Sequence, residues 1–551
     1  MGVSDWLKSL FRKSEAEKSV EAGGPAELVK AEPQGAKDQP EPAKPPSVLP
    51  PAEEVEQEAQ DLLKGVLVEE DLLLFPEEMD GKVAETIVPL NPKETGKAPE
   101  QRKPITPRPS REIKIWVGID FGTSFTKLAY RVLGGAGKVL PLNLGSNPQM
   151  PYAVPSLVAF EGGRILFGDE ADRFLRNRPW YEGARYLKVL FAGDINPTFL
   201  DREMKERFDR YCEGQQVDQA ILEPGYMVAA FLGHTIRRIR QHLGRTFDHE
   251  QSINFNVCIP IDTYEMADVR AGFQRAINVA EAIERKWNGQ RAIELLESAA
   301  SIWGKTPEVE IADSRVHLVP EAVAQMASYV NSLAAENKIH GVIDFGAGTT
   351  DFSIFNLCED AEEDKCAYWY NAVTFPGGMA KIENRIATWN REKGRNLNSS
   401  ELQSAMEGIL KMGPEIQAIV RAELQHIWKE ARFPAWGTAF KKRRRGSEWH
   451  KDKVKVFVCG GGSRIPYVRE IFERCWYCDE WGPYEVTALT APSDFEGNPK
   501  DFPRLAVAYG LTIPRPELAK YVLPKDCPDQ TPPLPPLYRP EPLGAVYDDT
   551  H

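Results

Sequence analysis

Hydrophobic and polar positions follow the same order in two segments of the chain, residues 113–132 and 342–357. In each segment an apolar run leads into Asp-Phe-Gly, small and hydroxyl-bearing residues follow, and a second apolar run begins. Alternation of apolar and other residues in the first run is typical of a strand with one buried face. Each segment therefore predicts a β-hairpin, rather than the strand-to-helix turn of a dinucleotide-binding fold.

The wider pattern from Ile113 to about Ile513 alternates strand-like and helix-like stretches, which predicts an α/β fold. The regions on either side differ from it. Residues 1–112 are mostly rich in Pro, Ala, Glu and Lys, a composition that predicts disorder because little apolar surface is available for burial. Residues 514–551 form a Pro-rich tail, which we expect to be extended.

Two short amphipathic segments interrupt the N-terminal region, at residues 4–13 and 55–75. Amphipathic helices of this kind can dock on other molecules. We therefore expect protein partners to bind through the terminal segments or through the surface of the folded part. Basic residues flank the apolar face of residues 4–13, so peripheral contact of this segment with the inner face of a membrane is an alternative.

Composition narrows the class of protein. The net charge of -13 argues against a nucleic-acid partner, because nucleic-acid binding leaves a basic footprint. No apolar run is long enough to predict a membrane span, and the first residues lack the apolar core of a secretory signal. The 8 scattered cysteines are typical of reduced cytosolic thiols, so we expect a cytoplasmic protein.

The two predicted turns contain residue types that hold phosphate. A glycine-rich turn exposes consecutive backbone N–H groups as a nest for anions, and hydroxyl side chains add donors. Carboxylates beside such a turn repel phosphate but suit the water shell of Mg²⁺. The candidate phosphate-binding residues are Gly122, Thr123, Ser124, Gly346, Ala347, Gly348 and Thr349, and the candidate ligands of Mg²⁺ through water are Asp120 and Asp344. Two such turns favour a nucleotide cleft between related lobes.

Further motifs occur in the order found in one superfamily. "IDFGTS" and "VIDFGAGTTDFS" resemble its two phosphate motifs, "HLVPEAVAQMASYV" and "RLAVAYGLTI" its two connecting helices, and "FVCGGGSRIPYVREIF" its adenosine motif. The chain thus resembles the actin/Hsp70/sugar-kinase ATPases, and within them the Hsp70 nucleotide-binding domain, over about residues 113–513. The resemblance implies lobe I at residues 113–339, completed by 492–513, and lobe II at 340–491.

The resemblance also implies ATP and Mg²⁺ as cofactors, ADP as product, and hydrolysis by an in-line water. Glu321 stands at the position of the acidic residue that orders this water. A cation should face the γ-phosphate, and both Arg185, by ungapped alignment, and Lys188, three residues on, stay candidates. The other implied contacts are Gly377 and Gly378 to phosphate, Gly460, Gly461 and Gly462 to ribose and α-phosphate, and Arg464 to adenine.

The sequence differs from the Hsp70 pattern at several points, so not every function of Hsp70 can be expected of this protein. Ala347 replaces a glycine in the second turn, Gly462 replaces a serine, and no peptide-binding domain is recognisable after Ile513. We therefore expect an ATP-binding and hydrolysing switch module, related to chaperones but without its own client-binding domain. The alternative is an actin-like filament-forming or membrane-linked scaffold ATPase, and a small-molecule kinase is a third reading.

Two remaining motifs have simpler explanations. The basic run Lys441–Arg445 predicts a solvated loop, with an anionic partner as the alternative. Cys475 and Cys478 have the spacing of half a zinc site or of a redox pair, but the sequence offers no second ligand pair at matching spacing.

Overall fold

The computed structural model describes residues 112–528, except residues 136, 248, 287–291, 361–363, 443–453 and 474–483. The predicted segments 4–13 and 55–75, most of the basic run Lys441–Arg445, the Cys475/Cys478 pair and the last part of the tail lie outside the described residues. The described part is an α/β structure built on two mixed sheets, which confirms the predicted α/β class.

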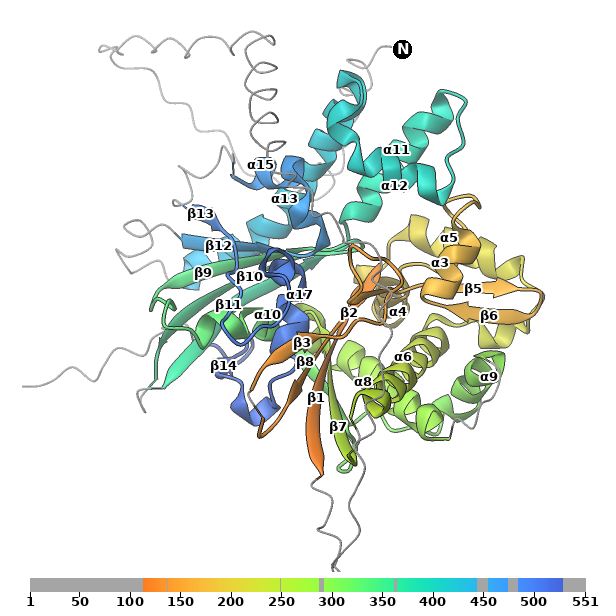
Figure 1. Ribbon diagram of the computed structural model, residues 1–551. Helices are drawn as coiled ribbons and strands as arrows, with labels where there is room; N and C mark the ends of the chain where they lie inside the picture. The colour runs from red at the N-terminus through yellow and green to blue at the C-terminus, as the bar shows by residue number, and fades with distance from the viewer. Residues whose placement is uncertain are drawn as a thin grey trace, which may run out of the picture. The chain divides into compact units, whose positions relative to one another are not determined.

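The first sheet contains the β-hairpin that the sequence predicts for residues 113–132. β1 and β2 form an antiparallel hairpin, and β1 pairs in parallel with β7, which pairs in parallel with β8 (Figure 1). Its order is β3-β2-β1-β7-β8, with β4 added to β2. The strands are β1 (Ile113–Phe121), β2 (Phe125–Val132), β3 (Val139–Pro141), β4 (Ala153–Pro155), β7 (Gln251–Ile259) and β8 (Val316–Pro320).

The second sheet repeats this order and these directions. β9 and β10 form the second predicted hairpin, β10 pairs antiparallel with β11, and β9 pairs in parallel with β12, which pairs in parallel with β13. The core order is therefore β11-β10-β9-β12-β13, and β14 is added beside β11. The strands are β9 (Ile339–Phe345), β10 (Thr350–Glu359), β11 (Lys365–Phe375), β12 (Val454–Cys459), β13 (Tyr484–Thr487) and β14 (Lys520–Val522).

Helices connect and cover the sheets, and a separate two-stranded ribbon, β5 (Val158–Glu161) with β6 (Arg164–Phe167), follows β4. We call residues 113–330 the first part and residues 339–487 the second part. The helices of the first part are α3 (Asp169–Leu175), α4 (Leu187–Ile195), α5 (Arg202–Glu213), α6 (Pro224–Thr246), α7 (Ile261–Glu265), α8 (Ala267–Arg285), α9 (Ala292–Trp303) and α10 (Glu321–Val330). The later helices are α11 (Met379–Glu392), α12 (Ser399–Glu407), α13 (Pro414–Lys442), α15 (Pro466–Glu473) and α17 (Phe502–Gly510).

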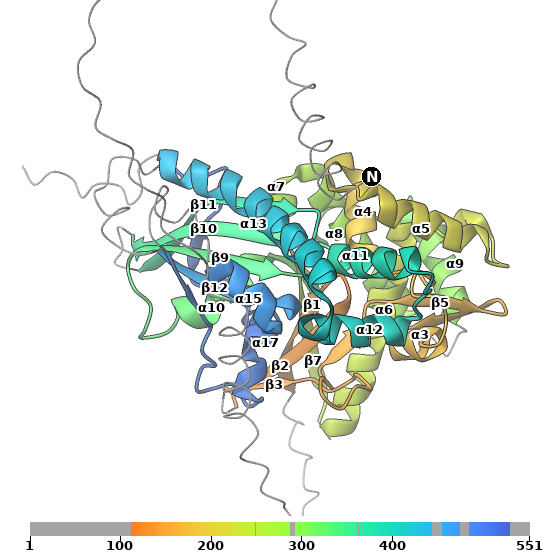
Figure 2. The same ribbon diagram turned by 90° about the horizontal axis from the view of Figure 1, so that it is seen from above.

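Apolar side chains from each sheet pack on helices at both faces. One face of the first sheet packs on α6 and α8, and one face of the second sheet packs on α13, which crosses it in Figure 2. The facing sides of both sheets share a core with α10 and α17. These two helices therefore form a common layer between the sheets.

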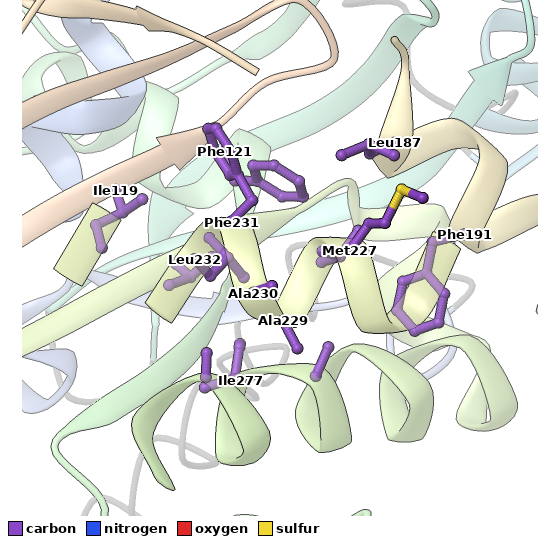
Figure 3. Packing of buried hydrophobic residues seen from close by; sticks show 14 of the residues in the cluster. Ile119, Phe121, Leu187, Phe191, Met227, Ala229, Ala230, Phe231, Leu232 and Ile277 are labelled. Atoms are coloured by element: carbon purple, nitrogen blue, oxygen red, sulfur yellow. The ribbon is translucent and has the colours of Figure 1, made fainter. Parts of the chain in front are cut away.

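The alternation predicted for β1 places its apolar side chains on the helix-covered face. Ile119 and Phe121 are fully buried and point toward α6, where Phe231 meets the ring of Phe121 at a centroid distance of 5.9 Å (Figure 3). Leu187 and Phe191 of α4 pack in the same cluster, near Met227 of α6 in Figure 3. Burial of these side chains holds α4 beside the end of β1.

The shared helix layer depends on glycines that allow backbones to approach. A Cβ atom at Gly510 of α17 would lie 1.9 Å from the carbonyl oxygen of Ala324 in α10. A Cβ atom at Gly118 of β1 would lie 2.1 Å from the carbonyl oxygen of Ala508 in α17. No side chain fits at either position, so α17 lies directly against both β1 and α10.

The segment after Ile513 differs from the expected tail. Residues 520–522 form β14, which pairs in parallel with β11, and Cys527 is buried in the core of the second sheet. Arg515 contacts both carboxylate oxygens of Glu310 at 3.0 and 2.8 Å, and Lys525 donates its backbone N–H to Glu265 at 2.8 Å. The strand escaped prediction because it is only three residues long and lies among prolines.

His340 is a fully buried polar residue of β9. Its ring stacks between Phe355 and Phe457, at centroid distances of 5.1 and 6.1 Å, and its Nε2 is 2.8 Å from the hydroxyl of Tyr329. Burial lowers the pKa of His340 to about 3. The folded protein therefore holds this imidazole neutral at pH values where the unfolded chain takes up a proton.

We expect Gly510→Ala to destabilise the fold by about 1–3 kcal/mol, the usual cost of forcing atoms into a packed site. The measurement is the free energy of unfolding in urea. Gly244→Ala is the matched control, because Gly244 lies in α6 with no atom within 4 Å of an added Cβ, and it should be neutral or slightly stabilising. Equal effects of the two substitutions would contradict the close contact.

We expect His340→Gln to reduce the loss of stability in acid. Because the pKa of His340 is lower in the folded state, its contribution is present above pH 6.5 and is lost as the pH falls toward 3, by up to about 1.4 kcal/mol per pH unit. The free energy of unfolding of both proteins, measured between pH 7 and pH 4, gives the difference in slope. Parallel curves would show that His340 is charged in the folded protein.

Candidate functional site

The two predicted turns lie against each other. A Cβ atom at Gly348, in the turn between β9 and β10, would lie 2.5 Å from Cγ2 of Thr123, in the turn between β1 and β2. It would also lie 2.8 Å from Cγ2 of Val189 in α4. The tip of one hairpin therefore touches the tip of the other, and α4 closes the same spot.

Asp120 lies at the end of β1 and is almost fully buried. One of its oxygens accepts a hydrogen bond of 2.6 Å from the ammonium of Lys127 in β2, and the other lies 3.8 Å from the thiol of Cys258 in β7. Burial acts to lower the pKa of Lys127, but the charges of Asp120 and Asp344 outweigh it, so the pKa of Lys127 is raised. Lys127 therefore stays charged and is attracted to acids of both sheets.

Lys188 and Glu321 form a second buried ion pair. Glu321 is the first residue of α10, directly after β8, and its Oε2 lies 2.8 Å from Nζ of Lys188. The two residues are only 8% and 9% exposed. Burial acts to lower the pKa of Lys188, but the charge of Glu321 outweighs it, so the pKa of Lys188 is raised and the ammonium persists.

Arg185, the other candidate cation, lies elsewhere. Its guanidinium donates to the backbone oxygen of Glu182 at 3.0 Å and to the hydroxyl of Ser399, in α12, at 3.2 Å. The structure thus brings Lys188, rather than Arg185, beside Glu321. Arg185 instead contributes a contact between the first and second parts.

Asp344 and Asp351 face each other across the β9–β10 pair. Gln325 of α10 donates to Asp344, while the hydroxyls of Thr349 and Thr374 donate to Asp351 at 3.0 and 2.7 Å. Burial and the charge of Glu321 raise the pKa of Asp344 to about 7 and that of Asp351 to about 8. Both carboxylates and Glu321 line one narrow pocket.

Two more of the predicted glycines, Gly378 and Gly460, lie against the second turn. A Cβ atom at Gly378 would lie 2.5 Å from the carbonyl oxygen of Gly346, and Ala380 donates its N–H to the carbonyl of Ala347 at 2.8 Å. A Cβ atom at Gly460 would lie 2.5 Å from Oδ1 of Asp344. These backbones therefore converge on the turn, and side chains are excluded from both positions.

The other predicted residues have more varied positions. Gly122 approaches Phe125 within its own turn, Gly377 approaches Phe375, and Gly462 approaches Phe345, whereas Gly461 has open space around it. Ser124 uses its backbone oxygen to accept from Ser156 at 2.8 Å. The side chain of Arg464 lies outside the described residues.

Sequence reasoning missed three residues of this site: Lys127, Asp351 and Cys258. Lys127 was part of the expected strand after the first turn. The available signal was that pairing of the two strands across this turn places Lys127 opposite Asp120. Asp351 follows Thr349 and Thr350 directly and carried a local signal, as a second acid at the second turn. Cys258 carried none, because it reaches the site only through the parallel pairing of β7 with β1.

Several side chains of the site could bind a metal ion. Asp120, Cys258 and Glu321 each offer one ligand atom, all within 4.8 Å of one another. Burial and the charge of Glu321 raise the pKa of Cys258 well above its usual value, so this thiol is protonated and a poor ligand. The carboxylates, with Asp344 and Asp351, suit a hard ion such as Mg²⁺ that keeps its waters, while the two lysines suit phosphate.

Comparison of the sequence with models of known protein families and with curated proteins finds no match. Within residues 112–528, apart from the undescribed gaps, no helix combines the length and apolar character needed to cross a membrane.

We expect Lys188→Met to destabilise the fold by about 3–5 kcal/mol, because it leaves the carboxylate of Glu321 buried without its partner. Adding Glu321→Gln should recover much of this loss. A double-mutant cycle on the free energy of unfolding measures the coupling. Additive losses in the double variant would contradict a direct ion pair.

Proposed function

We propose that the protein is a Mg²⁺-dependent ATP-binding and ATP-hydrolysing switch module, with two related lobes of the actin/Hsp70 kind around a nucleotide cleft. The observation that carries this proposal is the contact of Gly348 with Thr123, which joins two glycine-rich turns from two sheets. A nest of backbone N–H groups at each turn can bind phosphate from opposite sides.

The topology of the sheets gives independent support. Both sheets have three antiparallel strands followed by two parallel ones, and each acidic turn connects the same two positions of that order. A repeated unit with its loops facing each other is suited to enclose one ligand between them. The shared layer of α10 and α17 lies where two lobes would be joined.

The charges at the turns fit a magnesium-bound triphosphate. Among the described residues, two lysines, Lys127 and Lys188, form ion pairs with acids of this site; the acids of the site are Asp120, Glu321, Asp344 and Asp351. Burial, and then the charge of Glu321, raise the pKa values of Asp344 and Asp351, and a divalent cation would offset the negative charge of these acids. When bound, Mg²⁺ would supply positive charge and ATP the phosphoanhydride bond to be cleaved.

Each side chain then has a separate task. Lys188 and Lys127 offer ammonium groups to the terminal phosphates, and Thr123 offers a hydroxyl. Glu321, held by Lys188 at 2.8 Å, is placed to accept a proton from the attacking water and so to orient it. Asp120, Asp344 and Asp351 would hold the water shell of a bound Mg²⁺. Gly461, which has open space around it, would leave room for the ribose and α-phosphate.

A nucleotide switch acts by changing the binding of another molecule. Here that molecule would be a protein partner that binds the terminal segments or the surfaces of the lobes. Nucleotide between the lobes would favour their closed arrangement, and a partner that prefers that arrangement would respond. The filament-forming alternative predicts instead that ATP causes the protein to sediment. Pelleting with and without ATP separates the two.

We expect Asp344→Asn to weaken Mg²⁺-dependent ATP binding and turnover by on the order of 10- to 100-fold, the usual loss when a group that orients a metal is changed. The amide has the same shape and retains an oxygen for Gln325, so the fold should persist. Binding of a fluorescent ATP analogue and phosphate release measure the effect.

Glu213→Gln is the matched control, because Glu213 is an exposed acid at the end of α5, and it should leave both measurements unchanged. Affinity capture of partners with and without ATP, in the parent protein and in Asp344→Asn, tests the switch. A parent protein that neither binds nor hydrolyses ATP, or an Asp344→Asn variant with the parent rate, would overturn the proposal.

A further inference from the structure

Tyr186 has an unusual backbone conformation. Among the residues that the structure describes, it alone has a positive φ without being glycine, with φ 62° and ψ 29°. The left-handed region brings the Cβ atom of a bulky residue close to its own backbone, so it is disfavoured unless the surroundings hold it. Such strain persists where neighbouring contacts over-determine the backbone, often at functional sites.

Contacts on both sides hold Tyr186 in place. Its hydroxyl donates a hydrogen bond of 2.7 Å to Glu383 of α11, which belongs to the second part. Two residues earlier, Ala184 exchanges backbone hydrogen bonds of 2.8 and 3.2 Å with Val158 of β5, in the first part. Burial raises the pKa of Tyr186 well above its usual value, so the phenol stays neutral and keeps its proton for this bond.

The same residue begins the helix that carries Lys188. The backbone oxygen of Tyr186 accepts hydrogen bonds from the N–H groups of Val189 at 3.0 Å and Leu190 at 3.1 Å. The first turn of α4 then presents Lys188 to Glu321 and Val189 to Gly348. A displacement of Tyr186 would therefore displace both the ammonium and the methyl group that meet the paired turns.

We propose that Tyr186 is a positioning residue, whose hydrogen bond to Glu383 fixes the first turn of α4 and so aims the ammonium of Lys188 at Glu321. This inference rests on the proposed ATPase function and adds its regulation, because α11 of the second part sets the position of a cation carried by the first part. When α11 moves away, the bond to Glu383 breaks, the strained backbone relaxes, and Lys188 leaves its place. Hydrolysis is thereby limited to the arrangement in which the two parts are in contact.

A simpler reading is that the bond merely ties the two parts together. The structure offers a control for that reading, because Asn384, the next residue of α11, donates a hydrogen bond of 2.6 Å to Glu203 of α5. This bond also joins the two parts, but neither of its partners is Tyr186 or a residue of the first turn of α4. Asn384→Ala therefore removes a tie without touching the positioning contact.

The test compares Tyr186→Phe, Glu383→Gln and Asn384→Ala in the full chain. Hydrogen exchange of the amides at residues 187–190 reports the first turn of α4 without any nucleotide, and steady-state turnover of magnesium-ATP gives kcat and KM. We expect Tyr186→Phe to speed the exchange and to lower kcat by about tenfold each, the effect of losing one hydrogen bond to a charged group, with KM nearly unchanged.

Glu383→Gln keeps an oxygen that accepts the phenolic proton, so it should stay close to the parent in both measurements, and Asn384→Ala should do the same. Equal changes in Tyr186→Phe and Asn384→Ala would overturn the proposal in favour of a simple tie, and so would normal exchange in Tyr186→Phe. If the parent protein does not turn over ATP, the proposed function fails, but the exchange data still decide whether Tyr186 positions the turn that carries Lys188.

Discussion

The arrangement of the site depends on how closely α17 approaches its two neighbours. Gly118 and Gly510 remove the side chains that would otherwise separate this helix from β1 and from α10. As a result the two sheets share one thin helix layer, and the hairpins at their ends reach each other. A bulkier layer would move the sheets apart, and the acidic turns would then line two separate surfaces instead of one site.

Within the site, each lysine forms an ion pair with one acid, across a hairpin in one case and between distant parts of the chain in the other. Lys127 neutralises Asp120 between neighbouring strands, whereas Lys188 reaches Glu321 from a helix that lies 133 positions earlier in the sequence. Burying two such pairs is costly unless each is well aligned, so they add little net stability. Their effect is geometric, because each carboxylate holds its ammonium in a fixed orientation.

The features that could be predicted from the sequence are those set by local patterns of residues. The hairpins follow from alternation and from the Asp-Phe-Gly turns, and helices α10 and α17 lie in the two segments that resemble connecting helices. The choice between Arg185 and Lys188 could not be made, because they are three positions apart and only a distant partner, Glu321, distinguishes them. Cys258 and β14 depend on pairing between remote strands, which no local pattern encodes.

The segment after α17 is anchored to both parts of the molecule. Arg515 and Lys525 bind Glu310 and Glu265 of the first part, while β14, which lies between them in the chain, belongs to the second sheet. The segment therefore bridges the two parts. Rotation of one part against the other would put this segment under tension, until it stretched or one of its contacts broke.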